Sequence, residues 1–446
     1  MPKYLTETGA APPASPAPTR LVWLFGPALV AGVAYLDPGN VASNMTAGAT
    51  FGYLLVWVVV LANVMAWLIQ YLSAKLGIVT GRSLPELLGE RIRRPWARRA
   101  YWLQAELVAM ATDIAEVIGG AVALQLLFGV PLLVGGLITG LVSMAVLAVH
   151  SRRGARAFES VVIAMLLIIA IGFCAGIFLA PPDPAGIAGG LLPRFEGTDS
   201  VLLAASILGA TVMPHAIYAH SSLARDRFRP RTDDPRAGNP RTHRPRAGNP
   251  RLPARASGHG LVPTARLLTA TRWDVSIAMA VAGTVNLAML LLAASSLAGI
   301  PGTDSLEGAH AALRDSLGPV VATLFAVGLL ASGLASTSVG AYAGSEIMAG
   351  LLRVRVPLIA RRIVTLLPAL AILGAGVDPT WALVISQVVL SFGIPFALVP
   401  LVWLTSRGEL FGTFRNRTLT TVAGVAASVF LITLNALLLW LLLTGS

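Results

Sequence analysis

Cysteine is almost absent from this sequence of 446 residues, in which Cys174 is the only one. A single cysteine excludes an internal disulfide framework and any metal centre built from several cysteines. Charged residues are also scarce, at 12%, where soluble proteins have about 25%. Apolar residues make up 55% of the chain, more than a soluble protein of this size could bury. The composition therefore excludes an ordinary soluble enzyme and predicts a polytopic membrane protein.

The positive charge is concentrated in one segment, residues 225–272. The whole chain carries a net charge of +12, and this segment holds 12 arginines and 3 aspartates. It contains the repeat PRAGNPR twice, at 235–241 and 245–251. A segment so rich in Pro, Gly and Arg cannot form a packed core, so it is predicted to be a flexible cytoplasmic linker near anionic lipid head groups. An RNA-binding tract is the alternative, but the repeats lack aromatic residues to stack on bases, and no nucleic-acid partner is expected.

Eleven apolar segments are candidates for membrane-spanning helices. A bilayer core of about 30 Å takes about 20 helical residues to cross. The segments are Val130–Val149, Val161–Ala180, Val275–Ile300, Thr418–Ser446 and residues 21–46, 52–74, 101–128, 200–224, 319–350, 363–377 and 380–404.

The loops between these segments predict the topology. When alternate loops are assigned to opposite sides, 31 of the 33 basic residues fall on one side and only Arg194 and Arg314 on the other. Basic loops stay in the cytoplasm, which predicts a multi-pass protein of the cell membrane with a cytoplasmic N-terminus and an extracellular C-terminus. The predicted parts are a disordered cytoplasmic tail (1–20), a transporter core (21–405) that includes the linker 225–272, and an eleventh helix (417–446). A signal peptide over 1–36 is disfavoured, because the apolar pattern resumes directly after Asn40.

The first apolar segment is interrupted by Asp37-Pro38-Gly39-Asn40, a turn sequence in the middle of a span. Pro38 removes a backbone donor, and the carbonyl of Ala34 then loses its helical partner. Unsatisfied backbone is costly in hydrocarbon, and an ionised Asp adds about 3 kcal/mol or more. Both costs predict a bound cation. A simple proline kink is the alternative, although a kink requires neither Asp37 nor Asn40.

The sixth segment has a second break at Ala210-Thr211-Val212-Met213-Pro214-His215, where Pro214 frees carbonyls near Ala210. Taken alone, Pro214 could equally be a proline kink. Two interrupted helices five positions apart, however, suggest an inverted repeat of five plus five helices with a binding site between the breaks.

The residues at the two breaks offer a mixed set of metal ligands. Asp37 supplies a hard carboxylate oxygen, Asn40 a neutral oxygen and Met213 a soft thioether, while the freed carbonyls of Ala34 and Ala210 could complete the shell. A thioether adds affinity for transition metals and little for Mg²⁺ or Ca²⁺. The set favours Mn²⁺ or Fe²⁺, with Co²⁺, Zn²⁺ and Cd²⁺ as competitors. Plain packing is the alternative for Met213.

The third segment carries Glu106, Asp113 and Glu116, which fall within an arc of about 80° on one helix face. Carboxylates inside a membrane usually face the bundle interior and mark ion or proton paths. Arg361 and Arg362 at the start of the ninth segment could pair with Asp113 and Glu116, or they could be ordinary cytoplasmic flank charges.

Three further polar residues allow a functional and a structural interpretation. His215 and His220 are spaced by five residues, which does not suit a two-histidine metal face, so a proton relay or a buried hydrogen-bonded histidine is expected. Gln387 in the tenth segment could add a metal oxygen or could serve as a contact between helices.

These motifs resemble the Nramp family of proton-coupled divalent-metal transporters. The similar stretches are DPGN at 37–40, ATDIAE at 111–116, ATVMPH at 210–215 and ASGLASTSVGAYAG at 331–344, within a resemblance that runs from about 21 to 405 apart from the linker. The resemblance implies an all-α, LeuT-like fold with alternating access. It also implies import of Mn²⁺ or Fe²⁺ in symport with protons, with no enzymatic activity and no cofactor.

The resemblance also implies roles for individual residues. The sequence departs from the family pattern at Leu334, Ser345 and Gly393, where many members have Gln. These differences bear on fine selectivity and gating. The metal would be held by Asp37, Asn40 and Met213 with a backbone oxygen of Ala34 or Ala210, and by Gln387 in some conformations, while Asp113, Glu116, His215, Arg361 and Arg362 match positions linked to proton movement.

Two other functions are alternatives to metal transport. A sodium-coupled transporter of an organic solute would use the same architecture, but Met213 beside Asp37 argues against it. An intramembrane hydrolase would need a second paired aspartate or an HExxH helix, and the sequence has neither. The expected partners are therefore the metal ion, protons and the lipid bilayer, with no obligate protein partner.

The thioether can be tested directly. In Met213→Ala, we expect Cd²⁺ binding to weaken far more than Mn²⁺ binding, and Ca²⁺ or Mg²⁺ to be admitted, because a soft ligand is lost while the hard oxygens stay. Calorimetric titration of the purified protein with each metal measures this. Unchanged discrimination between the metals would remove the argument from the thioether.

Overall fold

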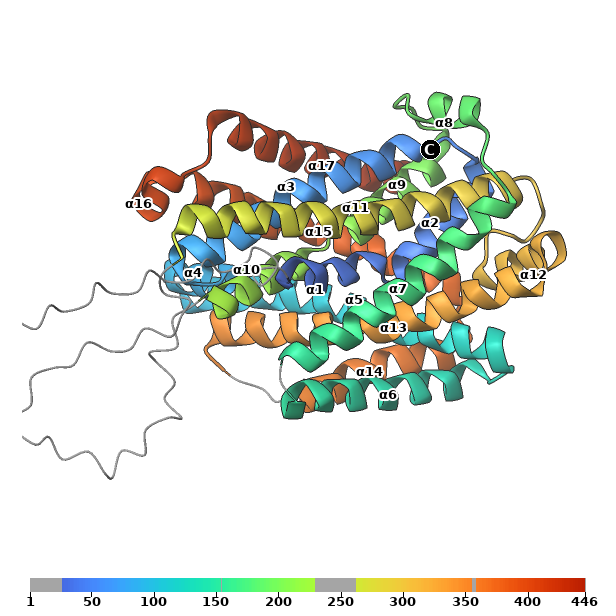
Figure 1. The fold of residues 1–446 in the computed structure, drawn as a ribbon, viewed down its shortest axis with the longest axis horizontal. Helices are drawn as coiled ribbons and strands as arrows, with labels where there is room; N and C mark the ends of the chain where they lie inside the picture. The colour runs from blue at the N-terminus through green and yellow to red at the C-terminus, as the bar shows by residue number, and fades with distance from the viewer. Residues whose placement is uncertain (1–25, 154, 229–261, 355–357, 446) are drawn as a thin grey trace, which may run out of the picture.

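The computed structural model describes residues 26–153, 155–228, 262–354 and 358–445 (Figure 1). Every regular element in these ranges is a helix, which confirms the all-α prediction. The predicted tail 1–20 and residues 229–261 of the predicted linker lie outside the described ranges. Helix continues into both ends of the linker segment, because residues 225–228 belong to α10 and residues 264–272 to α11.

The first broken helix consists of α1 (Pro27–Val33), a 3-10 turn η2 (Ala34–Leu36) and α2 (Pro38–Phe51). Asp37 stands between the two helices in an extended conformation, and its side chain caps α2. Asp is a preferred N-cap and Pro is favoured at the first helical position, so the same four residues that end one helix start the next. The predicted break is confirmed.

The second broken helix consists of α9 (Gly197–Thr211) and α10 (Pro214–Phe228). Val212, at φ −107° and ψ 46°, leaves the helical conformation between them. The interruption lies where Pro214 predicts it, and the prediction of two interrupted helices, the first and the sixth, is confirmed.

The other elements follow the predicted segments. Seven helices of the described residues, counting α9 with α10 as one, are long and apolar enough to cross a membrane. A helix or a broken pair lies in each of the eleven predicted segments, and the number of spans itself stays a prediction. The remaining elements are α3 (Val56–Thr80), α4 (Leu84–Arg91), α5 (Pro95–Phe128), α6 (Leu132–Arg153), α7 (Ala155–Leu179), α8 (Pro184–Gly190), α11 (Thr264–Ser296), α12 (Leu306–Leu317), α13 (Pro319–Ile347) with the π-helical η4 (Met348–Leu352), α14 (Leu358–Gly374), α15 (Pro379–Ser406), α16 (Gly408–Phe411), η5 (Gly412–Phe414) and α17 (Thr418–Thr444).

The short helices lie at the two ends of the bundle. α4 and α16 lie at one end in Figure 1, and α8 and α12 lie at the other. The first pair belongs to loops rich in arginine, and the second pair to the loops that contain Arg194 and Arg314. This arrangement agrees with the predicted segregation of charge, while the direction of the chain across the membrane stays a prediction.

The broken helices pack against several of the long helices. α2 packs on α9 and α11, α9 packs on α15, and α5 packs on α13. α17 packs only on the outer side, against α15, α9 and α3 among the described elements, and it is the least buried of the seven long apolar helices. The two breaks therefore lie among α3, α5, α11, α13 and α15, and the role of the eleventh segment as an addition to a ten-helix core stays a prediction.

Asp274 of α11 holds the start of α1. Its carboxylate accepts backbone hydrogen bonds from Gly26 at 3.3 Å and from Ala28 at 3.0 Å, and it is buried. The first N–H groups of a helix have no partner within it, so a carboxylate supplied by a neighbouring helix satisfies them and complements the helix dipole.

We expect Asp274→Ala to loosen α1, because its first N–H groups would lose their carboxylate acceptor, and loss of a capping side chain costs about 0.5–2 kcal/mol. Hydrogen exchange of the peptide that covers residues 26–33 should become faster. Asp183→Ala is the matched control, because Asp183 caps α8 through the N–H groups of Ala185 and Gly186 and should affect only that helix. Unchanged protection of α1 would contradict the capping role.

Candidate metal site

Asp37 lies in the first break with both carboxylate oxygens bonded. Oδ1 accepts a hydrogen bond from the backbone N–H of Asn40 at 2.9 Å, and Oδ2 accepts one from the side-chain amide of Gln387 at 3.1 Å. The residue is fully buried. These bonds offset part of the cost of burying a carboxylate, but no cationic side chain is bonded to it in the described part of the chain. Its negative charge is therefore available to a cation.

Asn40 joins the two breaks. Its side-chain nitrogen donates to the carbonyl of Tyr35 at 2.6 Å and to the carbonyl of Ala210 at 3.2 Å. Asn286 of α11 donates to the same Tyr35 carbonyl at 3.2 Å. The structure thus brings Asp37, Asn40 and Ala210 together, with side-chain amides bonding carbonyls that lost their helical partners.

Ala34 and Met213 also stand in the breaks. Ala34 begins η2, Met213 directly precedes Pro214, and both are buried. In the first break, the carbonyl that accepts hydrogen bonds from side-chain amides is that of Tyr35, one residue beyond Ala34. A 3-10 turn would pair Tyr35 with the N–H of Pro38, which proline lacks, so the sequence contained a signal for Tyr35 that helical spacing alone missed.

Gln387 of α15 packs closely against both broken helices. A Cβ on Gly39 would lie 1.7 Å from the amide nitrogen of Gln387, and a Cβ on Gly209 would lie 1.9 Å from its backbone oxygen. A side chain at position 209 would meet backbone and force α9 away from α15, whereas one at position 39 would require the Gln387 side chain to move. Of the two interpretations of Gln387, the structure supports a helix contact directly and also places the side chain against Asp37.

Four buried side-chain oxygens near the breaks make no hydrogen bond within the described ranges, those of Asn44, Thr211, Asn286 and Gln387. Asn44 is bonded to Asn40 through its nitrogen, and Thr211 directly follows Ala210. Buried oxygens rarely stay without a partner, so the cluster fits a cation. Sequence reasoning missed Asn44, Asn286 and Thr211, because isolated polar residues in a span carry no spacing signal.

Clusters of three or more His, Cys, Asp or Glu side chains that could hold a metal are absent from the described residues. An ion at the breaks would therefore be bound by one carboxylate together with amide, carbonyl and thioether groups. The metal-ligating role of this mixed set stays a prediction, and Asp37 is the single negative charge within it.

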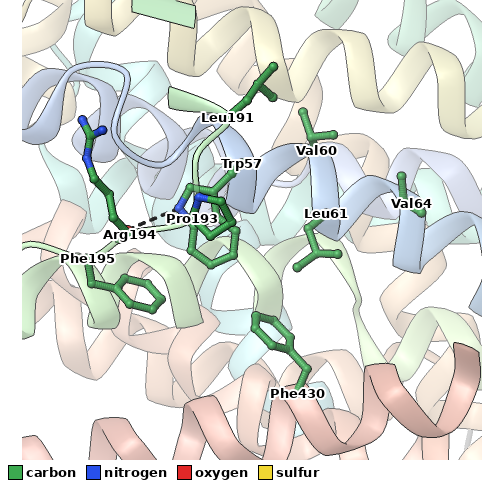
Figure 2. A pocket seen from close by; sticks show the side chains of 9 residues that line it. All are labelled: Trp57, Val60, Leu61, Val64, Leu191, Pro193, Arg194, Phe195 and Phe430. Carbon is green, nitrogen blue, oxygen red and sulfur yellow. Dashed lines mark hydrogen bonds between the residues drawn. The ribbon is translucent and has the colours of Figure 1, made fainter. Parts of the chain in front are cut away.

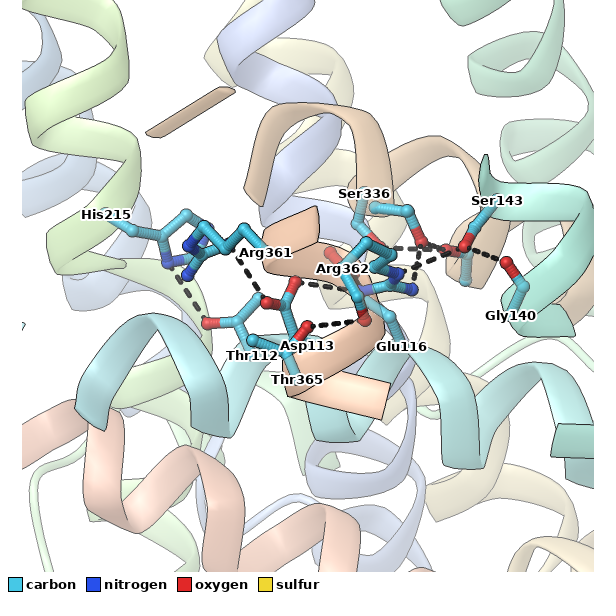
Figure 3. A network of polar contacts seen from close by, with 12 residues as sticks. Thr112, Asp113, Glu116, Gly140, Ser143, His215, Ser336, Arg361, Arg362 and Thr365 are labelled. Carbon is cyan, nitrogen blue, oxygen red and sulfur yellow. Dashed lines mark hydrogen bonds and ion pairs between the residues drawn. The ribbon is translucent and has the colours of Figure 1, made fainter. Parts of the chain in front are cut away.

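A network of ion pairs lies on α5, where the predicted carboxylates meet the two arginines of α14 (Figure 3). Arg361 contacts Glu106 at 3.0 Å and Asp113 at 3.1 Å. Arg362 contacts Asp113 at 2.8 Å and Glu116 at 3.1 Å. All five residues are buried, so Arg361 and Arg362 are not flank charges, and the expected pairs with Asp113 and Glu116 are present.

The network carries three carboxylates and two guanidinium groups. Arg362 is held further by Ser143 at 3.0 Å and by Thr337 at 3.2 Å. With every group ionised, one negative charge has no counterpart among these five, and an uncompensated charge in a buried place is costly. One bound proton would balance the charges of these five residues.

The network lies close to the first break. Gly119, one helical turn beyond Glu116, would place a Cβ 2.1 Å from the Cβ of Pro38. Gly333 of α13 would place one 2.9 Å from the carbonyl of Glu116. Small residues thus let α5 and α13 approach the break. Glu116 lies about one turn of α5 from Gly119, which faces Pro38, the residue after Asp37.

The two histidines of α10 have different surroundings. His215 Nδ1 lies 3.2 Å from the hydroxyl of Thr112, which is next to Asp113, so His215 adjoins the network (Figure 3). His220 Nδ1 lies 2.6 Å from the Oε1 atom of Gln70 on α3. The structure therefore brings His215 to the carboxylates and leaves His220 in a separate buried pair.

A groove of about 640 Å³ lies elsewhere, between α3, residues 191–195 and α17 (Figure 2). Its walls include Trp57, Leu61, Phe195 and Phe430, and the indole N–H of Trp57 donates to the carbonyl of Arg194 at 3.3 Å. None of the predicted site residues lines it. The predicted ion site is thus closed in this structure and separate from this apolar groove.

An all-α bundle with two broken helices in contact and a buried ionic network next to the breaks is the architecture of a multi-pass membrane transport protein. The sequence profile of the Nramp family, described as natural resistance-associated macrophage protein-like, matches residues 28–441. The chain belongs to the Nramp family, which confirms the resemblance.

Similar proteins cover nearly the whole chain. The divalent metal cation transporter MntH of Mycobacterium tuberculosis is 57% identical over 423 residues, 95% of this chain and 92% of the relative. MntH of Bacillus subtilis is 42% identical over 422 residues, 94% of this chain and 92% of the relative. The crystal structure of the manganese transporter of Eremococcus coleocola with an aromatic bis-isothiourea substituted compound superposes with a TM-score of 0.77 at 31% identity, covering 93% of this chain and 85% of that chain.

We expect Gly209→Ala to separate α9 from α15, because the new methyl group would meet the backbone at Gln387. Overpacking of this kind lowers the free energy of unfolding by about 1–3 kcal/mol, and the thermal unfolding temperature measures the effect. Gly189→Ala, on α8, is the matched control, because its Cβ would have no neighbour within 4 Å. Equal stability of the two variants would show that the close approach at Gln387 is not required.

Proposed function

We propose that this protein imports divalent transition metal ions, Mn²⁺ and Fe²⁺ foremost, across the cell membrane in symport with protons. The observation that carries the proposal is the meeting of Asp37, Asn40 and the Ala210 carbonyl at two facing helix breaks, with Gln387 closing over them. The relatives named divalent metal cation transporter MntH support the same substrate class.

The ligand chemistry supports a transition metal over the common hard cations. Asp37 supplies the single anionic oxygen, and Asn40, Gln387 and the carbonyls of Ala34 and Ala210 supply neutral ones. Ca²⁺ prefers six to eight oxygens and Mg²⁺ keeps its own waters, whereas a site with the Met213 thioether favours softer ions.

The second part of the proposal concerns the coupling proton. We assign it to a path from Asp37 through Glu116 and Asp113 toward Glu106, with Arg361 and Arg362 holding the carboxylates. The charge imbalance of the network supports this path, since a proton neutralises it. His215 adjoins the path through Thr112, while the Gln70 pair of His220 supports a structural role for that histidine.

Transport by alternating access is the third part. Asp37, Asn40 and Met213 are inaccessible to solvent here, so loading or release of an ion requires the half-helices to move. Arg225 at the end of α10 contacts Glu86 at 2.7 Å and Glu346 at 3.0 Å. These contacts, and the Asp274 cap on α1, hold the half-helices that opening would displace. The proposed direction is inward, with the N-terminus in the cytoplasm.

Uptake into liposomes across a panel of metals, with the internal pH recorded, tests the proposal. Mn²⁺, Fe²⁺ and Cd²⁺ should accumulate and acidify the lumen, while Ca²⁺ and Mg²⁺ should not. Uptake that depends on sodium and is inhibited by amino acids, but not by Cd²⁺, would favour the organic-solute transporter instead.

We expect Asp113→Asn to lower proton flux while leaving some metal uptake, because the network would lose the carboxylate that both arginines share. Acidification during Mn²⁺ uptake measures the change. Glu307→Gln on α12 is the control, since it removes a carboxylate outside the network. Normal acidification by Asp113→Asn liposomes would exclude Asp113 from the proton path.

A further inference from the structure

An arginine-rich surface lies at the end of the bundle that carries α4 and α16, apart from the ion site (Figure 1). Two stretches that are distant in the sequence form it, residues 91–99 and residues 403–417. They hold eight arginines and one carboxylate, Glu409. We call this surface the arginine patch, and its arginines are Arg91, Arg93, Arg94, Arg98, Arg99, Arg407, Arg415 and Arg417.

Trp403 joins the two stretches. The guanidinium carbon of Arg91 lies 5.0 Å from the centre of its ring, and that of Arg407 lies 4.5 Å away. Two cations therefore flank one indole ring. The cation–π interaction stabilises each guanidinium group but does not neutralise its charge.

The second stretch is fixed in place by buried contacts. Asn416 donates from its backbone to the carbonyl of Thr405 at 3.0 Å and from its side chain to the Thr405 hydroxyl at 2.8 Å. Lys75 of α3 donates to Asn416 at 2.9 Å. Arg415 and Arg417 stand on either side of Asn416. They are thus held next to Thr405, which lies in the last turn of α15, two residues before Arg407.

Carboxylates do not neutralise the patch. The ion pairs of the described residues involve Arg82, Arg194, Arg225, Arg361 and Arg362 but none of the eight arginines of the patch. The neighbouring Glu90 is already paired with Arg82. The patch therefore keeps a strong positive charge for an external anion.

An exposed apolar track leads along α15 to the patch. Phe396, Val399 and Trp403 are 49%, 45% and 42% exposed, and they follow one another at spacings of three and four residues, which places them on one helix face. Arg407 directly follows Ser406, the last residue of α15, and has an extended backbone. A face that is apolar within a membrane span and ends in arginine matches a phospholipid, whose acyl chain lies along the helix and whose phosphate lies at its end.

We propose that the arginine patch binds an anionic phospholipid of the adjoining leaflet, with the phosphate held by Arg91 and Arg407 beside Trp403 and an acyl chain on the Phe396–Trp403 track. Guanidinium groups bind phosphate through paired hydrogen bonds, which supports a headgroup site over general attraction. A nucleic acid or a free phosphate would use the arginines but not the apolar track.

Quenching by brominated lipids tests the proposal on the full chain in nanodiscs. Brominated phosphatidylglycerol and brominated phosphatidylcholine are each introduced into a phosphatidylcholine bilayer, and tryptophan fluorescence is recorded. The difference between the wild type and Trp403→Phe isolates the signal of Trp403. Phosphatidylglycerol should quench this signal more strongly at equal mole fraction.

The arginine variants decide the assignment. Arg407→Gln should lower the preference for phosphatidylglycerol about fivefold, and Arg91→Gln with Arg407→Gln should abolish it. Arg353→Gln is the matched control, because Arg353 is exposed and lies outside the patch, directly after η4, which packs on α4 at the same end, and it should leave the preference unchanged. Thermal unfolding confirms that each variant is folded.

Four outcomes would overturn the proposal. Equal quenching of the wild type by both lipids would show no headgroup site. An equal loss in Arg353→Gln and Arg407→Gln would indicate general surface charge. Removal of the preference by soluble glycerol phosphate would identify a free anion as the ligand, and removal by a short single-stranded RNA would identify a nucleic-acid surface.

Discussion

The structure depends on hydrogen bonds between the two interrupted helices, which supply partners for backbone carbonyls that the breaks leave unpaired. The breaks leave backbone carbonyls without helical partners in an apolar interior, where each unsatisfied group is costly. Asn40 compensates by donating to the carbonyls of Tyr35 and Ala210, one from each break. The hydrogen bonds that stabilise the fold therefore also gather oxygens around Asp37. An ion that enters would replace amide hydrogens as the partner of these oxygens, so stability and ion binding use the same atoms.

The ionic network on α5 meets a related constraint. Three carboxylates and two guanidinium groups are buried together, and neither set could be buried without the other. Glycines at 119 and 333 bring this network to within about one helical turn of Pro38 and the first break. The arrangement places the buried carboxylate of Asp37 close to the buried ionic network, through one helix. The coupling proposed here needs this proximity.

Much of the site could be predicted because the sequence breaks its own pattern there. Asp37, Asn40, Met213 and the three carboxylates stand out as polar or helix-breaking residues within apolar spans. Asn44, Asn286 and Thr211 gave no such signal, because their importance comes from neighbours on other helices. Arg361 and Arg362 were open to two interpretations, since residues at the start of a span can point to water or into the bundle. The five-residue spacing of His215 and His220 left open which of them would meet the network.

Hydrophobicity and helix-breaking residues act locally, so the sequence by itself determined the membrane class, the helical segments and the positions of both breaks. The pairing of those segments was decided only by the tertiary structure. Contacts such as Gln387 with Asp37, 350 residues apart, arise from packing between helices, and so do the Arg361 and Arg362 pairs and the joining of residues 91–99 to Trp403. Helical periodicity shows which face of a helix is polar, but it does not show which other helix that face will meet.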